Sequence, residues 1–151
     1  SLWTRDAEEE LLPLCAELGV GYVAYSPLGR GFLTGTITGQ DSLEESDRRR
    51  QHPRFAEENL AQNVKLLATL TELAAAECCT PAQLALAWVA SRGKGIVPLP
   101  GTKQRKWLDQ NIAALSVSPS TETLEALDAA FRPGVAAGTR YPAGQMASLG
   151  V

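Results

Sequence analysis

The apolar residues of the chain follow two patterns, one with helical spacing and one of short continuous runs. The first helical stretch follows Asp6, a candidate N-cap with Glu9 three residues later, and its apolar positions continue to Leu18. Gly19 then gives it a stop signal. Pro13 lies inside this stretch, so it either kinks the helix or marks its true first turn.

Two short apolar runs rich in strand-forming residues predict buried β-strands. Val20–Ser26 follows the first helix directly and stops at Pro27, and Gly95–Leu99 has the same character. Ser1–Trp3 is a third candidate, a stub of a strand. Because strands that alternate with helices are typical of parallel βα units, the sequence predicts an α/β fold.

Helical spacing returns in the second half of the chain and predicts four more helices before an irregular tail rich in Gly, Ala and Pro. Thr80 as N-cap and Pro81 at the first helical position begin the second of these helices. The predicted segments are a helix over Ala56–Cys78, one from Thr80 to near Gly93, one over Lys103–Ala114, one from Ser120 or Thr121 to Phe131, and the tail 132–151.

Two or three parallel strands with helices outside them do not close into an edge-free sheet. The predicted elements therefore indicate a piece of a larger fold, or a chain that pairs with another through its open strand edge. An incomplete sheet also buries less apolar surface than a closed one, so we expect marginal stability.

Length and charge fit an ordinary globular domain or part of one. The chain has 151 residues, 44% of them hydrophobic, and a net charge of −3 from 14 basic and 17 acidic residues. A faintly acidic chain is a poor general binder of nucleic acid or of an anionic membrane, and no apolar stretch has the length of a membrane span. The start, Ser1–Asp6, lacks the features of a signal peptide and an initiating Met, so we expect a chain cut from a longer one.

The chain has three cysteines, Cys15, Cys78 and Cys79, with no C-x-x-C spacing. An odd number without a metal-binding pattern is typical of reduced thiols in a cytosolic protein. We therefore predict a cytoplasmic location and expect all three side chains to pack within helices.

A long loop separates the first strand from the next helix. It runs from Gly29 to Pro53, and loops of this length in compact domains are usually functional lids or mobile segments. Its basic run, Arg48–Arg50, is expected to be a solvated surface. His52 is the chain's single histidine, and we expect it to pack in the loop or lie at the surface rather than to act in catalysis.

Two segments carry candidate chemistry, and each lies where a predicted strand ends. They are Tyr25–Gly31 and Pro100–Arg105, and in parallel α/β folds ligands bind at the carboxyl ends of strands. Glycines allow a ligand to approach the backbone closely, and Thr102, Lys103 and Arg105 offer a hydroxyl and positive charge at a helix N-terminus. This pattern suggests a site for an anion or nucleotide phosphate, and a plain turn with exposed cations is an equal alternative. Neither segment has the Rossmann or P-loop pattern, and no cluster with metal-ligand spacing is present.

Several segments together resemble the C-terminal half of aldo-keto reductases, of the bacterial, fungal and plant type related to potassium-channel β subunits. The resemblance covers nearly the whole chain and implies one partial barrel domain over 1–151, the C-terminal portion of a TIM (α/β)₈ barrel. In that barrel the stub is strand six, and the two longer runs are strands seven and eight. The similar segments are Ser1–Asp6, Tyr22–Gly35, Pro53–Phe55, Glu58–Leu60 with Asn63, Pro100–Lys103, Leu108–Ile112 and Gly138–Pro142.

The family reduces aldehydes and ketones with NADPH, so the resemblance implies an NADP(H) site. Tyr25 matches the aromatic residue that stacks on the nicotinamide ring, and a buried core tyrosine is the alternative. The next residues match the loop across the pyrophosphate, where backbone amides and Arg30 would bind. These loop residues are Ser26, Pro27, Leu28, Gly29, Arg30 and Gly31.

The second segment matches the adenosine end of the cofactor. Lys103 and Arg105 would favour NADPH over NADH, because a 2′-phosphate requires a cation. Trp107 either stacks on the adenine or packs on the helix surface. The implied contacts are Gly101, Thr102 and Lys103 at the 2′-phosphate, and Gln110 and Asn111 at the adenine.

The family's catalytic tetrad of Asp, Tyr, Lys and His belongs to its N-terminal half, and those motifs do not occur here. Tyr22, Tyr25 and Tyr141 do not lie in the required context, so no catalytic or metal-binding residue is assigned to this chain. The first hypothesis is part of an NADP-dependent oxidoreductase whose substrate is a small aldehyde or ketone. The alternative is a non-catalytic remnant or nucleotide-binding accessory module. The sequence does not indicate the oligomeric state.

Overall fold

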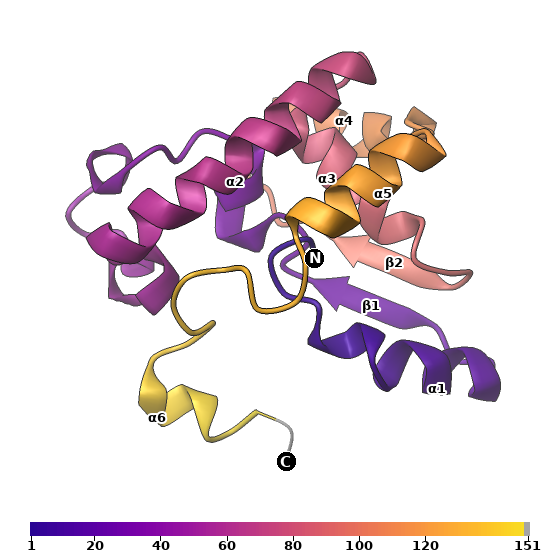
Figure 1. Cartoon of the computed structure of the whole chain (residues 1–151), viewed down its shortest axis with the longest axis horizontal. Coiled ribbons are helices and arrows are strands. Elements are labelled where there is room, and N and C mark those ends of the chain that lie inside the picture. Colours follow the sequence, from indigo (N-terminus) through magenta and orange to yellow (C-terminus); the bar gives the residue numbers. More distant parts are fainter. Residues whose placement is uncertain (150–151) are drawn as a thin grey trace.

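A computed structural model describes residues 1–149, and it contains six α-helices, two β-strands and several short 3₁₀ turns (Figure 1). Residues 150 and 151, which our predicted domain and tail include, lie outside the described part. The elements are α1 (Leu11–Leu18), β1 (Tyr22–Tyr25), α2 (Glu57–Ala76), α3 (Pro81–Ala90), β2 (Ile96–Leu99), α4 (Arg105–Ala113), α5 (Thr121–Ala130) and α6 (Ala143–Met146).

The strands β1 and β2 form a parallel pair, as predicted (Figure 1). Tyr22 lies opposite Ile96 and Tyr25 opposite Leu99, so both strands end at the same level. The predicted stub at Ser1–Trp3 is wrong, because this segment forms a turn closed by the Thr4 amide and the Ser1 carbonyl. Its apolar residues, which suggested a strand, are buried in the core instead.

The two faces of the strand pair have different surroundings. Ala24 belongs to the buried core, and Tyr22 and Ile96 pack against this core. Val23 and Val97 alternate with these residues and are exposed. The sheet therefore has one packed face and one open apolar face.

The hydrophobic core is built around α3, which contacts α2, α4, β2 and the turn after β1. Trp88 of α3 is fully buried. The N-terminal segment joins this core through Trp3, whose ring stacks on Phe32 at 3.9 Å between centroids and meets the edge of Phe55 at 5.6 Å. The start of the chain, the long loop and the central helices thus share one core.

Two helices, α3 and α5, begin at the caps that the sequence indicates, whereas α1 does not. Asp6 does not cap α1, because residues 6–8 form a separate 3₁₀ turn and the helix begins at Leu11. Pro13 is then the third helical residue, where no backbone hydrogen bond is lost through its missing N–H. Thr80 caps α3 as predicted, and Ser120 caps α5 by accepting a hydrogen bond from the Thr123 amide at 3.1 Å.

The long loop after β1 is held by the core along its length. It contains 3₁₀ turns, and its apolar side chains Phe32, Leu33, Ile37 and Leu43 are buried, as is Phe55 just beyond it. The expected solvated surface at Arg48–Arg50 is confirmed only for Arg48. Arg50 donates to the carbonyls of Gln40, Leu43 and Glu44, which the turns of the loop bring together around its guanidinium.

The three cysteines are free thiols in different environments. Cys15 on α1 is half-buried, and Cys79 packs against the core, where burial raises the pKa of its thiol. Cys78 is exposed and has a φ of +53° just beyond α2. The expectation that all three pack within helices is therefore wrong for Cys78 and Cys79, which lie in the bend between α2 and α3.

Helices α2 and α3 meet at an angle of 86° across a short break. Within residues 1–149 no single helix is long and apolar enough to cross a membrane, although this bent pair together meets the criteria of length and composition.

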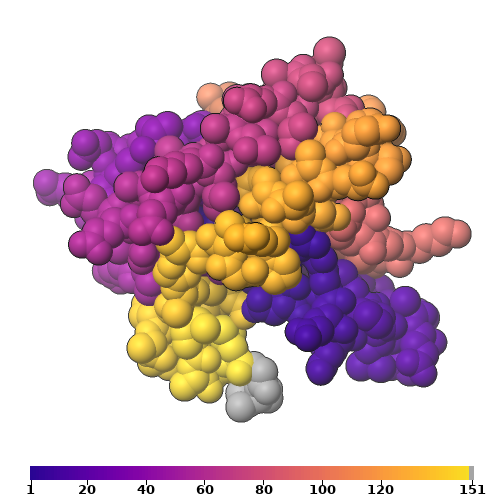
Figure 2. All heavy atoms as spheres, in the orientation of Figure 1, coloured from indigo at the N-terminus to yellow at the C-terminus, as the bar shows by residue number. Residues whose placement is uncertain are grey.

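The tail returns across the molecule after α5 and packs against the start of α2 (Figure 2). It is irregular as predicted up to Pro142, and α6 follows. Asn63 is a buried polar residue of α2 that accepts from the Ala137 amide at 2.8 Å and donates to the Ala137 carbonyl at 3.0 Å. One buried amide side chain therefore fixes the path of the tail.

Candidate functional site

A groove lies between the loop that follows β1 and the segment that links β2 to α4. It contains about 1690 Å³ of empty space, with its open side included. The cofactor contacts predicted from the sequence line it except Tyr25 and Gly29, which line an adjoining cavity. The predicted residues that it brings together are Ser26, Pro27, Leu28, Arg30, Gly31, Gly101, Thr102, Lys103, Trp107, Gln110 and Asn111. Arg105, the second predicted cation at the 2′-phosphate, is exposed beside the groove and does not line it.

The loop after β1 is a tight coil stabilised by its own hydrogen bonds. Ser26 and Arg30 have φ values of +50° and +58°, which are unusual for residues with side chains. The Gly29 amide donates to the Ser26 carbonyl at 2.9 Å, and the Arg30 amide donates to the Ser26 hydroxyl at 3.2 Å. Gly29 also has φ +55°, and a Cβ there would lie 2.8 Å from the Trp3 ring. Only glycine fits this position.

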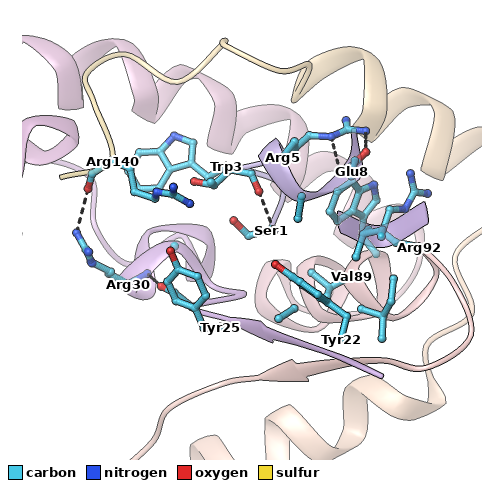
Figure 3. A pocket seen from close by; sticks show the side chains of 18 of the residues that line it. Ser1, Trp3, Arg5, Glu8, Tyr22, Tyr25, Arg30, Val89, Arg92 and Arg140 are labelled. Atoms are coloured by element: carbon cyan, nitrogen blue, oxygen red, sulfur yellow. Dashed lines mark hydrogen bonds and ion pairs between the residues drawn. The ribbon is translucent and has the colours of Figure 1, made fainter. Parts of the chain in front are cut away.

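Arg30 projects a guanidinium that no carboxylate neutralises within residues 1–149. Its Nη1 lies 2.6 Å from Nδ1 of His52. The same atom lies 3.4 Å from the Arg140 carbonyl oxygen (Figure 3). Burial, then the charge of Arg30, lowers the pKa of His52, so the neutral ring accepts the hydrogen bond. His52 therefore packs within the loop, as expected.

Tyr25 ends β1 with its side chain at the rim of the adjoining cavity (Figure 3). The residue is 51% exposed, which excludes the alternative of a buried core tyrosine. Its hydroxyl lies 3.2 Å from that of Tyr141, and partial burial together with this hydrogen bond raises the pKa of Tyr25. The exposed ring is free to contact a planar ligand.

Arg49 is a groove residue that sequence reasoning missed. Asp47 accepts from its backbone amide at 2.9 Å and from Nη2 at 2.6 Å, and these hydrogen bonds lower the pKa of Asp47 to about 2. The guanidinium also donates to the Arg30 carbonyl at 3.0 Å. Asp47 caps the turn at 48–51, and such a capping signal could have separated Arg49 from a solvated run.

The opposite wall is the segment before α4. Thr102 accepts from the Gln104 amide at 3.2 Å, and Lys103 is exposed beside it. The first turn of α4 contains Arg105 and Lys106 and no acidic residue. Cations at the positive end of a helix are unfavourable, so this end would be stabilised by an anion.

Three α4 residues continue this wall along the groove. Trp107 is 41% exposed and lies under the ammonium of Lys106, which is 4.3 Å from the ring centroid. Gln110 donates through Nε2 to the Thr80 hydroxyl at 2.9 Å, so its Oε1 stays available. Asn111 makes no side-chain hydrogen bond to any residue of the described chain.

The adjoining cavity lies on the inner side of Tyr25 and contains about 850 Å³ of empty space (Figure 3). Arg54 and Arg140 line it, and burial together with the charge of Arg140 lowers the pKa of Arg54. Arg54 donates to the Trp3 carbonyl at 2.7 Å and to the Thr4 hydroxyl at 2.6 Å. Among residues 1–149 no group of three or more His, Cys, Asp or Glu side chains is arranged to hold a metal ion.

Comparison with known proteins gives one consistent family. The aldo/keto reductase family matches residues 1–132. The "Probable aldo-keto reductase 1" of Glycine max is 49% identical over 141 residues, which are 93% of this chain and 40% of that protein. The chain thus spans well under half of this relative.

Solved structures agree at the level of the fold. The structure of a thermostable aldo-keto reductase in complex with the inhibitor epalrestat matches with a TM-score of 0.60 and 28% identity, over 85% of this chain and 36% of that one. A glycerol dehydrogenase of Gluconobacter oxydans matches with a TM-score of 0.74 and 22% identity, over 85% and 39%. This chain's α/β arrangement is therefore part of their fold.

Proposed function

Because the chain belongs to the aldo/keto reductase family, we propose that it forms the NADP(H)-binding part of an oxidoreductase that reduces small aldehydes or ketones to alcohols. The observation that supports this most directly is the groove, which collects the predicted cofactor residues from two separate segments. The complete enzyme would be a TIM barrel, of which this chain supplies the C-terminal portion.

At one end of the groove, Tyr25 stacks on the nicotinamide ring and Arg30 binds the pyrophosphate. The exposed ring of Tyr25 and the carboxylate-free guanidinium of Arg30 suit these roles. The amides of Gly29 and Arg30 already donate within the loop, so the guanidinium supplies most of the binding there.

At the other end, Lys103 and Arg105 bind the 2′-phosphate together with the N-terminus of α4. The excess positive charge in this turn favours NADPH over NADH, because only NADPH brings the neutralising phosphate. Gln110 accepts through its free Oε1 from the adenine amino group, Asn111 binds the adenine edge, and Trp107 covers the ring.

The bound cofactor supplies a hydride to the substrate carbonyl, and the proton donor comes from the part of the family fold that this chain does not contain. The residues of this chain bind and orient the cofactor. A non-catalytic nucleotide-binding module would use the same groove, so only assays with the complete fold separate the two.

Fluorescence titration of the chain with NADPH tests the proposed binding. We expect saturable binding that the substitution Lys103→Ala weakens about tenfold, equal to about 1.4 kcal/mol, while binding of NADH changes little. Lys94→Ala is the matched control, since Lys94 is an exposed lysine that precedes β2 and so lies at its opposite end. Absence of saturable NADPH binding, or an equal effect of both substitutions, would contradict the assigned site.

A further inference from the structure

The tail of the chain returns to the end of β1 and contacts Tyr25 and Arg30, the residues assigned to the nicotinamide and the pyrophosphate. The Tyr141 hydroxyl is 3.2 Å from the Tyr25 hydroxyl, and the Tyr141 ring lies 4.8 Å from the guanidinium carbon of Arg30. The Arg140 carbonyl accepts from the same guanidinium at 3.4 Å. More than one hundred residues separate these partners in the sequence, so the contacts are purely tertiary.

Few other contacts hold Tyr25 and Arg30 in position. The Tyr25 side chain is half exposed at the end of β1, and its one side-chain hydrogen bond within residues 1–149 is to Tyr141. Apart from the tail, the Arg30 guanidinium has the His52 ring as its partner. Without Tyr141, the Tyr25 ring would lose its hydrogen bond and the guanidinium would lose the aromatic surface beneath it.

The tail itself is firmly attached, so it can position other groups. Asn63 is buried and binds both backbone groups of Ala137. Gly138 has φ +83°, and a Cβ there would lie 2.8 Å from the Pro53 carbonyl oxygen. Thr139 donates its hydroxyl to the Tyr141 carbonyl at 2.8 Å. These contacts fix the backbone of residues 137–141 against the start of α2.

We propose that Tyr141 is a positioning residue, which orients the Tyr25 ring and the Arg30 guanidinium for the nicotinamide and pyrophosphate of the cofactor. This inference rests on the proposed function. It makes the tail part of one end of the cofactor site, whereas the adenosine end at Lys103 and Gln110 is independent of it.

Two substitutions separate the contributions of the Tyr141 side chain. Tyr141→Phe removes the hydrogen bond to Tyr25 and keeps the ring under Arg30, and Tyr141→Ala removes both. We expect NADPH affinity to fall about fivefold in Tyr141→Phe and about twentyfold in Tyr141→Ala, as the loss of one neutral hydrogen bond and of one cation–π contact implies. Gln145→Ala, at an exposed position of α6, is the control and should bind as the wild type does.

Binding of 2′,5′-ADP distinguishes positioning from general support of the fold. This ligand carries only the adenosine end of NADPH, so its affinity should change less than twofold in both Tyr141 variants. Lys103→Ala should weaken both ligands. Equal losses of NADPH and 2′,5′-ADP affinity in Tyr141→Ala, or an unchanged NADPH affinity, would overturn the inference.

Hydrogen exchange of the free chain tests the same inference without a ligand. We expect the amides of Ser26 and of residues 28–31 to exchange about tenfold faster in Tyr141→Ala, with α5 unchanged. If the wild-type chain binds neither ligand, the proposed function of this chain fails, and the exchange result then decides the role of Tyr141. Unchanged exchange of the loop would refute that role.

Discussion

Asp128 on α5 connects three parts of the molecule through one carboxylate. It accepts from the indole nitrogen of Trp88 at 3.0 Å and forms ion pairs with Arg5 and Arg92, both at 3.0 Å. The two guanidinium groups also lie over the Trp88 ring, 5.0 and 4.6 Å from its centroid. The N-terminal segment, α3 and α5 are thus joined at a single residue.

Replacing Asp128 by alanine should destabilise the fold by about 2 kcal/mol, because it leaves a buried indole N–H unpaired and removes the carboxylate of Arg92, whereas Arg5 keeps its ion pair with Glu8. Urea unfolding measures the effect. Glu125→Ala, at an exposed position on the same helix, should change the free energy of unfolding by less than about 0.5 kcal/mol. Similar losses in both variants would show that the carboxylate has no special role.

At the scale of elements, the N-terminus of α3 is linked to the groove. Thr80 accepts from the Gln83 amide at 3.2 Å and Gln83 accepts from the Thr80 amide at 2.9 Å, which completes a capping box. The Thr80 hydroxyl also accepts from Gln110 of α4. One cap therefore stabilises α3 and holds a proposed adenine-binding side chain.

Thr80→Ala and Ser120→Ala should each cost about 1 kcal/mol of stability, since each removes a helix N-cap. Of these two capping residues, Thr80 contacts Gln110 and Ser120 does not. NADPH affinity should therefore fall about fivefold in Thr80→Ala and remain unchanged in Ser120→Ala. Thermal unfolding and fluorescence titration of the two variants provide the comparison. A loss of affinity in Ser120→Ala as large as that in Thr80→Ala would contradict the proposed link.

The same elements show what sequence patterns can predict. The long helices were predictable because helical spacing and local caps such as Thr80 act within a few residues. The strand predicted at Ser1–Trp3 is wrong because apolar residues can be buried in a core whether or not they pair as a strand. The prediction that Asp6 caps the first helix is wrong because a separate 3₁₀ turn precedes the start of α1.

At the scale of the whole molecule, the open face of the sheet exposes apolar side chains that no other part of the described chain covers. Val23, Val97 and Leu99 are exposed there, and Leu115 is exposed elsewhere, after α4. Both outer edges of the two-stranded sheet are also unpaired within the described chain. Exposed apolar side chains beside unpaired strands favour association.

We expect the chain to self-associate with rising concentration, which sedimentation velocity measures. The double substitution Val23→Lys with Val97→Lys should shift the distribution toward monomer with little loss of stability, because both side chains are already exposed. Leu115→Lys removes an exposed apolar residue away from the sheet and should leave association unchanged. Monomeric behaviour of the unsubstituted chain at all concentrations would contradict this expectation.

The site was predictable where its residues follow a strand directly. Arg30 and Lys103 fall within segments that the resemblance places at the cofactor, and the groove contains them. Arg49 and Tyr141 were not assigned a role, since tertiary contacts alone bring them there. Their positions depend on the path of a long loop and of a tail that Asn63 anchors, and neither leaves a periodic pattern in the sequence.

The register of β1 against β2 sets the length of ligand that the groove can hold. Tyr25 lies opposite Leu99, and the residues that we propose for the nicotinamide and the 2′-phosphate lie at or beyond these two positions. A slip of one residue would displace one end by about 3.3 Å, more than a hydrogen bond can tolerate, and would reverse the side chains of one strand. The four paired positions of each strand thus set the spacing between the two ends of the proposed dinucleotide site.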